Sequence, residues 1–171
     1  AEIRIPSDLI YLRSVRAFIK ELAKNLGFPQ GKVKDIELAT DEILSNAIEH
    51  GSEGSHSEIL LRVKVTDETI EIIISDTGNQ DNLKEKWTLA WSNVIKKKIH
   101  YGTERGHGLF LTYNLTDKMC MESNSSGGLD ARLIWYIGRK NEYNKANIVH
   151  YNPQVTERHT KDQKVYESGK L

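Results

Sequence analysis

The stretch DEILSNAIEHG, from Asp41 to Gly51, carries two side chains that could do chemistry together. Glu42 and Asn46 are four residues apart, so a helix would bring a carboxylate and an amide to a common point. The carboxylate could orient a nucleophile, and an amide oxygen is a hard ligand that suits a divalent cation such as Mg²⁺. A solvated helix face is the alternative interpretation, and for a Glu/Asn pair alone it is the commoner one.

A second candidate is Asp76 in ISDTGN, where an apolar run leads directly into a glycine-bearing turn. A buried carboxylate at that position could accept a hydrogen bond from an amino group such as that of adenine. Gly78 would let a planar ring approach the backbone. The alternative is a strand-ending Asx turn without a ligand.

A third candidate is TERGHGLFL, in which Gly106 and Gly108 precede an apolar helical pattern. Helix N-termini offer unpaired N–H groups and a positive dipole end, so they bind phosphates well. Arg105 adds positive charge beside the glycines, whereas only the backbone of His107 need matter. A flexible hinge is the alternative interpretation of the two glycines.

The elements that must position these residues can be predicted from hydrophobic spacing and turn residues. We expect Ser7 to cap the first helix at its N-terminus and Gly27 to end it. The predicted elements are a strand over residues 1–6, helices over 8–26 and 32–50, a hairpin over 58–75, a helical pattern over 83–99, a helix over 108–117, and strands over 118–123 and 129–137.

This order predicts an α+β fold, because hairpins dominate the strands and the helices can all cover one face. We expect a two-layer sandwich with a mixed, mostly antiparallel sheet covered on one face by helices. Residues 1–138 would form one domain. Residues 139–171 are polar, mildly basic and aperiodic, which is typical of an extension or a partly disordered tail.

Composition narrows the class of protein without naming a function. The 171 residues contain 24 Lys and Arg against 24 Asp and Glu, so no global charge favours nucleic acid or anionic lipid. A single cysteine, Cys120, excludes an internal disulfide framework and fits a reducing compartment. No apolar run approaches membrane-spanning length, and AEIRIPSD does not resemble a secretory signal. We therefore expect a cytoplasmic protein that binds neither nucleic acid nor membranes directly.

Taken in order, the three candidates resemble the motifs of the GHKL superfamily of ATPases, which includes histidine kinases, gyrases and heat-shock chaperones. ELATDEILSNAIEHG is similar to its N box, DTGNQ to half of its first glycine box, and ERGHGLFLTYNLTD to its second glycine box. The resemblance covers about residues 1–138. A small domain with one strand and one helix before the N box most resembles the bacterial anti-sigma factor serine/threonine kinases.

The resemblance implies a Bergerat-type ATP-binding fold and a role for each matched position. Glu42 would be the general base, and Arg105 would neutralise charge on the transferred phosphoryl group. Asn46 would hold Mg²⁺, with a lid over about residues 80–105. The residues that would contact ATP or ADP are Asn46, His50, Asp76, Gly78, Gly106, His107, Gly108 and Leu109. A helix C-terminal cap is the alternative role for His50.

The resemblance also implies protein partners. These are a small antagonist protein that is phosphorylated on serine or threonine, a sigma factor or similar regulator that is sequestered, and a second copy in a homodimer. Two departures favour a rival hypothesis, a binding module that holds nucleotide weakly and acts only through partners. Gln80 stands where the first glycine box has its second glycine, and the last strand lacks a threonine near its start. A kinase-like domain that works beside a larger signalling protein is a third possibility.

Overall fold

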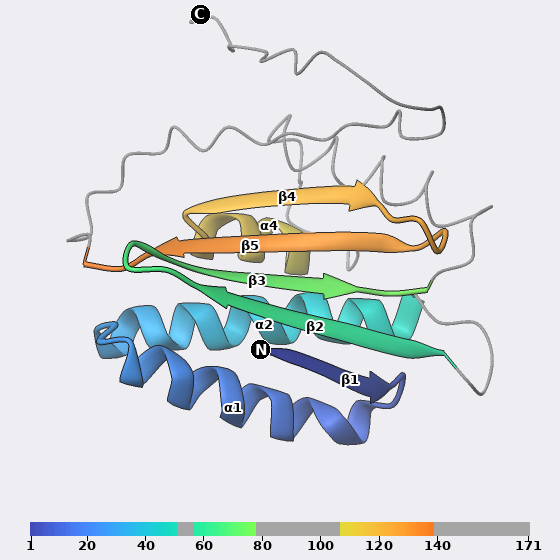
Figure 1. The fold of residues 1–171 in the computed structure, drawn as a ribbon, viewed down its shortest axis with the longest axis horizontal. Coiled ribbons are helices and arrows are strands. Elements are labelled where there is room, and N and C mark those ends of the chain that lie inside the picture. The colour runs from blue at the N-terminus through green and yellow to red at the C-terminus, as the bar shows by residue number, and fades with distance from the viewer. Residues whose placement is uncertain (51–56, 78–106, 139–171) are drawn as a thin grey trace, which may run out of the picture.

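The computed structural model describes residues 1–50, 57–77 and 107–138. They form two layers, a five-stranded sheet and a layer that contains three α-helices (Figure 1). The strands follow the order β1-β2-β3-β5-β4, and all four pairings between them are antiparallel. The α+β sandwich predicted from the sequence is confirmed, without a parallel pairing among the described strands. The elements are β1 (Glu2–Pro6), α1 (Leu12–Asn25), α2 (Gln30–His50), β2 (Glu58–Val65), β3 (Thr69–Ser75), α4 (His107–Leu115), β4 (Lys118–Ser123) and β5 (Leu129–Tyr136).

The core lies between the two layers because alternate residues of each strand are apolar. Strand β5 shows the pattern most clearly, since every second side chain from Leu129 to Trp135 is buried. Trp135 is fully buried, and its Nε1 donates a hydrogen bond to the Leu115 carbonyl at 2.8 Å, which ties β5 to the end of α4. The other face of the sheet carries ion pairs, such as Arg132 with Glu71 at 2.9 Å.

The first helix begins differently from the prediction. Ser7 was expected to cap a helix starting at Asp8, but the cap is Asp8, whose carboxylate accepts a hydrogen bond from the Ile10 amide at 2.9 Å. A short 3₁₀ turn, Leu9–Tyr11, follows before α1 proper. Ser7 Oγ instead donates to the Ile48 carbonyl of α2, a tertiary contact that the local sequence does not reveal. The end of α1 is as predicted, because Gly27 has φ +80° and stops the helix.

Helix α2 is two residues longer at its start than the predicted helix over 32–50. It begins at Gln30, and the Val33 amide donates to the Pro29 carbonyl at 3.0 Å, so the proline sits at the helix entrance. Ion pairs hold α1 against one side of α2, with Arg16 to Asp41 at 2.6 Å and Lys20 to Glu37 at 3.2 Å. None of the helices in the described ranges is long and apolar enough to span a membrane.

The two hairpins that follow match the prediction. The Thr66 amide donates to the Thr69 carbonyl at the β2–β3 turn, and residues 124–128 link β4 to β5. The helical pattern over residues 83–99, the lid over 80–105 and the tail over 139–171 lie outside the described residues, so these remain predictions.

Candidate active site

Glu42 and Asn46 meet a glycine of α4. A Cβ atom placed on Gly108 would collide with Glu42 Oε2, would lie 3.3 Å from Glu42 Cδ, and would lie 3.9 Å from Asn46 Nδ2. The carboxylate and the amide therefore converge on the first turn of α4, as the one-turn spacing predicts. Only glycine leaves room at position 108 for the carboxylate to rest against the helix backbone.

The antiparallel packing of α2 and α4 creates this meeting point. At one end Glu42 of α2 contacts Gly108 at the start of α4. At the other end Lys32, near the start of α2, forms an ion pair with Asp117 just after α4, at 3.2 Å. The first turn of α4, whose N–H groups have no partner within the helix, therefore lies beside the two α2 side chains.

Burial shifts the acid–base behaviour of Glu42. The pKa of its carboxyl is raised, first by partial burial and then by the negative charges of Asp41 and Glu49. Asp41 is engaged by Arg16, whereas no cation within the described ranges pairs with Glu42. A carboxylate whose pKa is raised binds a proton more tightly than an ordinary glutamate, which is the direction that a general base requires.

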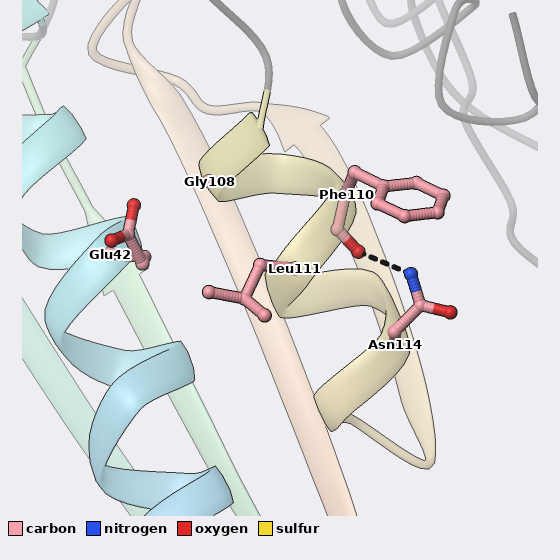
Figure 2. Close-up of a pocket in the computed structure, with 5 residues that line it drawn as sticks. All are labelled: Glu42, Gly108, Phe110, Leu111 and Asn114. Atoms are coloured by element: carbon pink, nitrogen blue, oxygen red, sulfur yellow. Dashed lines mark hydrogen bonds between the residues drawn. The ribbon is translucent and has the colours of Figure 1, made fainter. Parts of the chain in front are cut away.

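An open cavity of about 420 Å³ lies beside Glu42. Its described lining consists of Glu42, Gly108, Phe110, Leu111 and Asn114, four of them from α4 (Figure 2). Figure 2 shows the Leu111 side chain directed toward α2, with Phe110 and Asn114 on the opposite side of α4. Phe110 and Leu111 are more than a third exposed, so the carboxylate opens onto an accessible apolar surface.

Asp76 lies at the end of β3 and is buried, with 7% of its surface exposed. Its Oδ1 accepts a hydrogen bond from the Leu129 amide at 3.1 Å. We call the small space around it, about 10 Å³ in volume, the Asp76 recess. Besides Asp76, the recess is lined by apolar residues: Ile43, Ala47, Ile74, Met121, Leu129 and Ala131. A volume of this size admits at most about one water molecule, so a purine ring would lie at its mouth or displace side chains.

Helix α2 contributes residues both to the contact with Gly108 and to the Asp76 recess. Glu42 and Asn46 face Gly108, while the next residue after each, Ile43 and Ala47, lines the Asp76 recess. Consecutive helix positions are rotated by about 100° from each other, so one stretch of α2 can face Gly108 with some residues and the Asp76 recess with the next. The structure thus places Glu42, Asn46, Asp76 and Gly108 around one segment of a single helix.

Two further residues support Asp76, and the sequence interpretation missed their importance. Asn124 Nδ2 donates to the Asp76 carbonyl at 2.8 Å. A Cβ atom on Gly128 would collide with Asp76 Oδ1 and the Asp76 carbonyl oxygen, and would lie 2.7 Å from its carbonyl carbon. The stretch NSSGG predicts only a turn. A turn commonly needs a single glycine, so the second glycine, Gly128, was the available sign of a close contact at this position.

Of the remaining predicted site residues, only some lie within the described ranges. Gly78, Arg105 and Gly106 lie outside the described residues, and so do the side chains of His50 and His107. Leu109 is buried in the hydrophobic core with 4% of its surface exposed, so its side chain does not line the cavity. Its backbone amide in the first turn of α4 is the group that could reach a ligand.

Comparison with known proteins places this chain in a family. The family model described as histidine kinase-like ATPase domain matches residues 5–135. The chain belongs to this family. The GHKL resemblance read from the three motifs is thereby confirmed, and the matched range contains Glu42, Asn46, Asp76 and Gly108.

Similar proteins point to protein kinases within that family. The chain is 25% identical over 153 residues to the serine-protein kinase RsbW of Bacillus pumilus, and the match covers 88% of this chain and 93% of the relative. It is 26% identical over 151 residues to the RsbW of Bacillus cereus, covering 86% and 91%. It is 22% identical over 151 residues to the RsbW of Bacillus subtilis, covering 88% and 93%.

A solved structure supports the fold. The RsbU and RsbW domains of a Mycobacterium tuberculosis protein match with a TM-score of 0.51 at 19% identity, over 78% of this chain and 32% of that one. At this level of identity the likeness concerns the architecture alone. It agrees with the two-layer arrangement in Figure 1.

Proposed function

We propose that this chain is an anti-sigma factor-type serine/threonine-protein kinase. It binds Mg-ATP, phosphorylates a small antagonist protein, and sequesters a sigma factor or a similar regulator in a partner switch. The observation that carries the proposal is the convergence of Glu42 and Asn46 on Gly108, with Asp76 held on the other side of the same helix segment. The similarity to serine-protein kinases over most of the chain supports it.

The residues near Asp76 fit an adenine base. A purine needs an apolar surface and a hydrogen-bond acceptor for its amino group, and the recess offers both. Asp76 would accept the amino proton, while Ile43 and Ala47 would contact the ring edge. Gly78 would lie against the ring if the first glycine box acts here as it does in the family.

The residues near Gly108 fit the phosphates and their cation. The first turn of α4 offers backbone N–H groups, to which Gly106, His107 and Leu109 would contribute. Asn46 supplies one hard oxygen, and Mg²⁺ commonly takes only one or two protein ligands while water and phosphate oxygens complete its shell. Within the described ranges, no group of three or more Asp, Glu, His or Cys side chains is placed to hold a metal ion.

Bound ATP would supply the γ-phosphoryl group, and Mg²⁺ would offset the charge on its oxygens. Glu42 would accept the proton of a serine or threonine hydroxyl that enters from the cavity side. Its raised pKa makes it a competent acceptor, and the cavity of about 420 Å³ leaves room for an incoming protein segment. Phe110 and Leu111 would contact the residues beside the hydroxyl. Arg105 would act on the developing charge, as the resemblance implies.

The partners in this proposal follow from the family resemblance. They are an antagonist protein with a phosphorylatable hydroxyl, a sigma factor or similar regulator, and a second copy of the chain in a homodimer, all in a bacterial cytoplasm. A pull-down from an extract of its own cells, with and without ATP, tests them. Recovery of the same proteins in equal amount under both conditions would contradict an ATP-dependent partner switch.

The kinase activity is tested by Glu42→Gln. Transfer of labelled phosphate from ATP to the antagonist recovered in the pull-down should fall at least about 100-fold, the usual contribution of a general base. Glu21→Gln is the matched control, since Glu21 is exposed on α1 and is not among the charges that raise the pKa of Glu42. Equal transfer by the Glu42 variant and the wild type would exclude Glu42 as the base.

A nucleotide-weak binding module is the second candidate function. The Asp76 recess has a volume of only about 10 Å³, and Gln80 replaces a glycine of the first glycine box. Both features favour weaker binding of the base. Calorimetry with ADP and with ATP plus Mg²⁺ separates the two candidates, because micromolar affinity supports the kinase and absence of binding at millimolar nucleotide supports the module.

A further inference from the structure

The turn between β4 and β5 is fastened to the end of β3 by one side chain. Asn124 Nδ2 donates to the Asp76 carbonyl at 2.8 Å and to Asp130 Oδ1 at 3.2 Å. Asn124 Oδ1 accepts from the amides of Ser126 at 3.0 Å and Gly128 at 2.9 Å. The nitrogen and the oxygen of the Asn124 amide therefore make different contacts. The oxygen closes the turn, and the nitrogen joins the turn to Asp76.

Asp76 is also held by Leu129, the first residue of β5, through its own polar groups. Its amide donates to the Leu129 carbonyl, and its Oδ1 accepts from the Leu129 amide, each at 3.1 Å. Gly128 lies so close to Asp76 that a side chain there has no room. Since β3 ends at Ser75, Asp76 is the first residue beyond the strand, and these contacts fix both its backbone and its carboxylate.

We propose that Asn124 is a positioning residue that sets the direction of the Asp76 carboxylate for the amino group of an adenine base. The inference rests on the proposed function. An asparagine side chain carries its donor and its acceptor on two separate atoms, so Asn124 can close the turn with Oδ1 while Nδ2 holds Asp76. A misdirected Asp76 would lose the hydrogen bond that distinguishes adenine from a base with an oxygen at the same position.

The test compares ATP with inosine triphosphate, which carries that oxygen, by calorimetry on the full chain. Asn124→Asp keeps the oxygen that closes the turn but replaces the donor to Asp76 with an acceptor. We expect its affinity for ATP to fall about tenfold, the equivalent of one lost hydrogen bond, and its affinity for inosine triphosphate to change less than twofold. Ser125→Asp adds the same charge at an exposed neighbouring position and should leave both affinities unchanged.

Two further measurements separate positioning from a general loss of structure. Asn124→Ser shortens the side chain without adding charge, and it should reduce selectivity for ATP in the same way. Amide hydrogen exchange at Leu129, followed by NMR without nucleotide, should accelerate in both variants, because that amide donates to Asp76 Oδ1. Amides in α1 should retain their exchange rates.

The outcomes distinguish this inference from the proposed function. Equal wild-type affinity for ATP and inosine triphosphate would overturn the adenine role of Asp76 and the inference with it. Selectivity in the wild type that persists in both Asn124 variants would overturn the inference alone. So would unchanged exchange at Leu129 in both variants.

Discussion

Replacing Gly108 with alanine should separate phosphate transfer from folding. The new Cβ would meet Glu42 Oε2, the flexible end of a side chain, so the carboxylate can move away while both helices stay in place. The move takes the general base away from its working position. A displacement of about 1 Å at a catalytic group can lower a rate about 100-fold, which corresponds to about 2.7 kcal/mol of activation free energy.

The stability of the Gly108→Ala variant should stay close to that of the wild type. Alanine favours a helix over glycine by about 0.5–1 kcal/mol, which offsets the cost of moving one carboxylate. Gly31→Ala is a matched control, because Gly31 is the second residue of α2, as Gly108 is of α4, and nothing lies within 4 Å of its added Cβ. Gly31→Ala should gain that stability and keep full activity.

The assay measures phosphate transfer to the antagonist protein at saturating ATP, with urea unfolding in parallel. Glu42→Gln is then added to the Gly108→Ala variant. If Gly108 acts through Glu42, the double variant should be scarcely slower than either single variant. A Gly108→Ala variant with a wild-type turnover rate would refute the reasoning, and so would fully additive losses in the double variant.

Three further changes test other parts of the structure. Gly128→Ala places a Cβ against the backbone of Asp76, which cannot move aside, so urea unfolding should show a loss of about 1–3 kcal/mol; unchanged stability would contradict the close contact. Glu49→Gln removes a negative charge that raises the pKa of Glu42, so the acidic limb of the pH–rate profile should move to lower pH; a move to higher pH would exclude Glu42 as the titrating group. Thr40→Val replaces a buried hydroxyl that has no hydrogen-bond partner within the described part of the chain, so the free energy of unfolding should rise by about 1 kcal/mol. Calorimetry measures it, and a lower free energy of unfolding in the variant would contradict an unpaired hydroxyl at Thr40.

Much of the site was predictable because its parts are local. The spacing of Glu42 and Asn46 follows from the helical period, and Asp76 was expected at the end of a strand. The start of the first helix was predicted wrongly, since Ser7 and Asp8 are both good capping residues. Ser7 contacts Ile48, which lies far along the chain, and Asp8 takes the capping role instead. Local propensity carries no information about such a partner.

The sequence by itself determined the element order, the alternating core strands and the pairing of Glu42 with Asn46, because each depends on short-range backbone geometry. Only the tertiary structure decided that Glu42 meets Gly108, and that Asn124 and Gly128 hold Asp76. Those contacts depend on the antiparallel packing of α2 against α4 and on the pairing of β3 with β5. Packing between distant segments is set by the whole core, so no single motif could predict it.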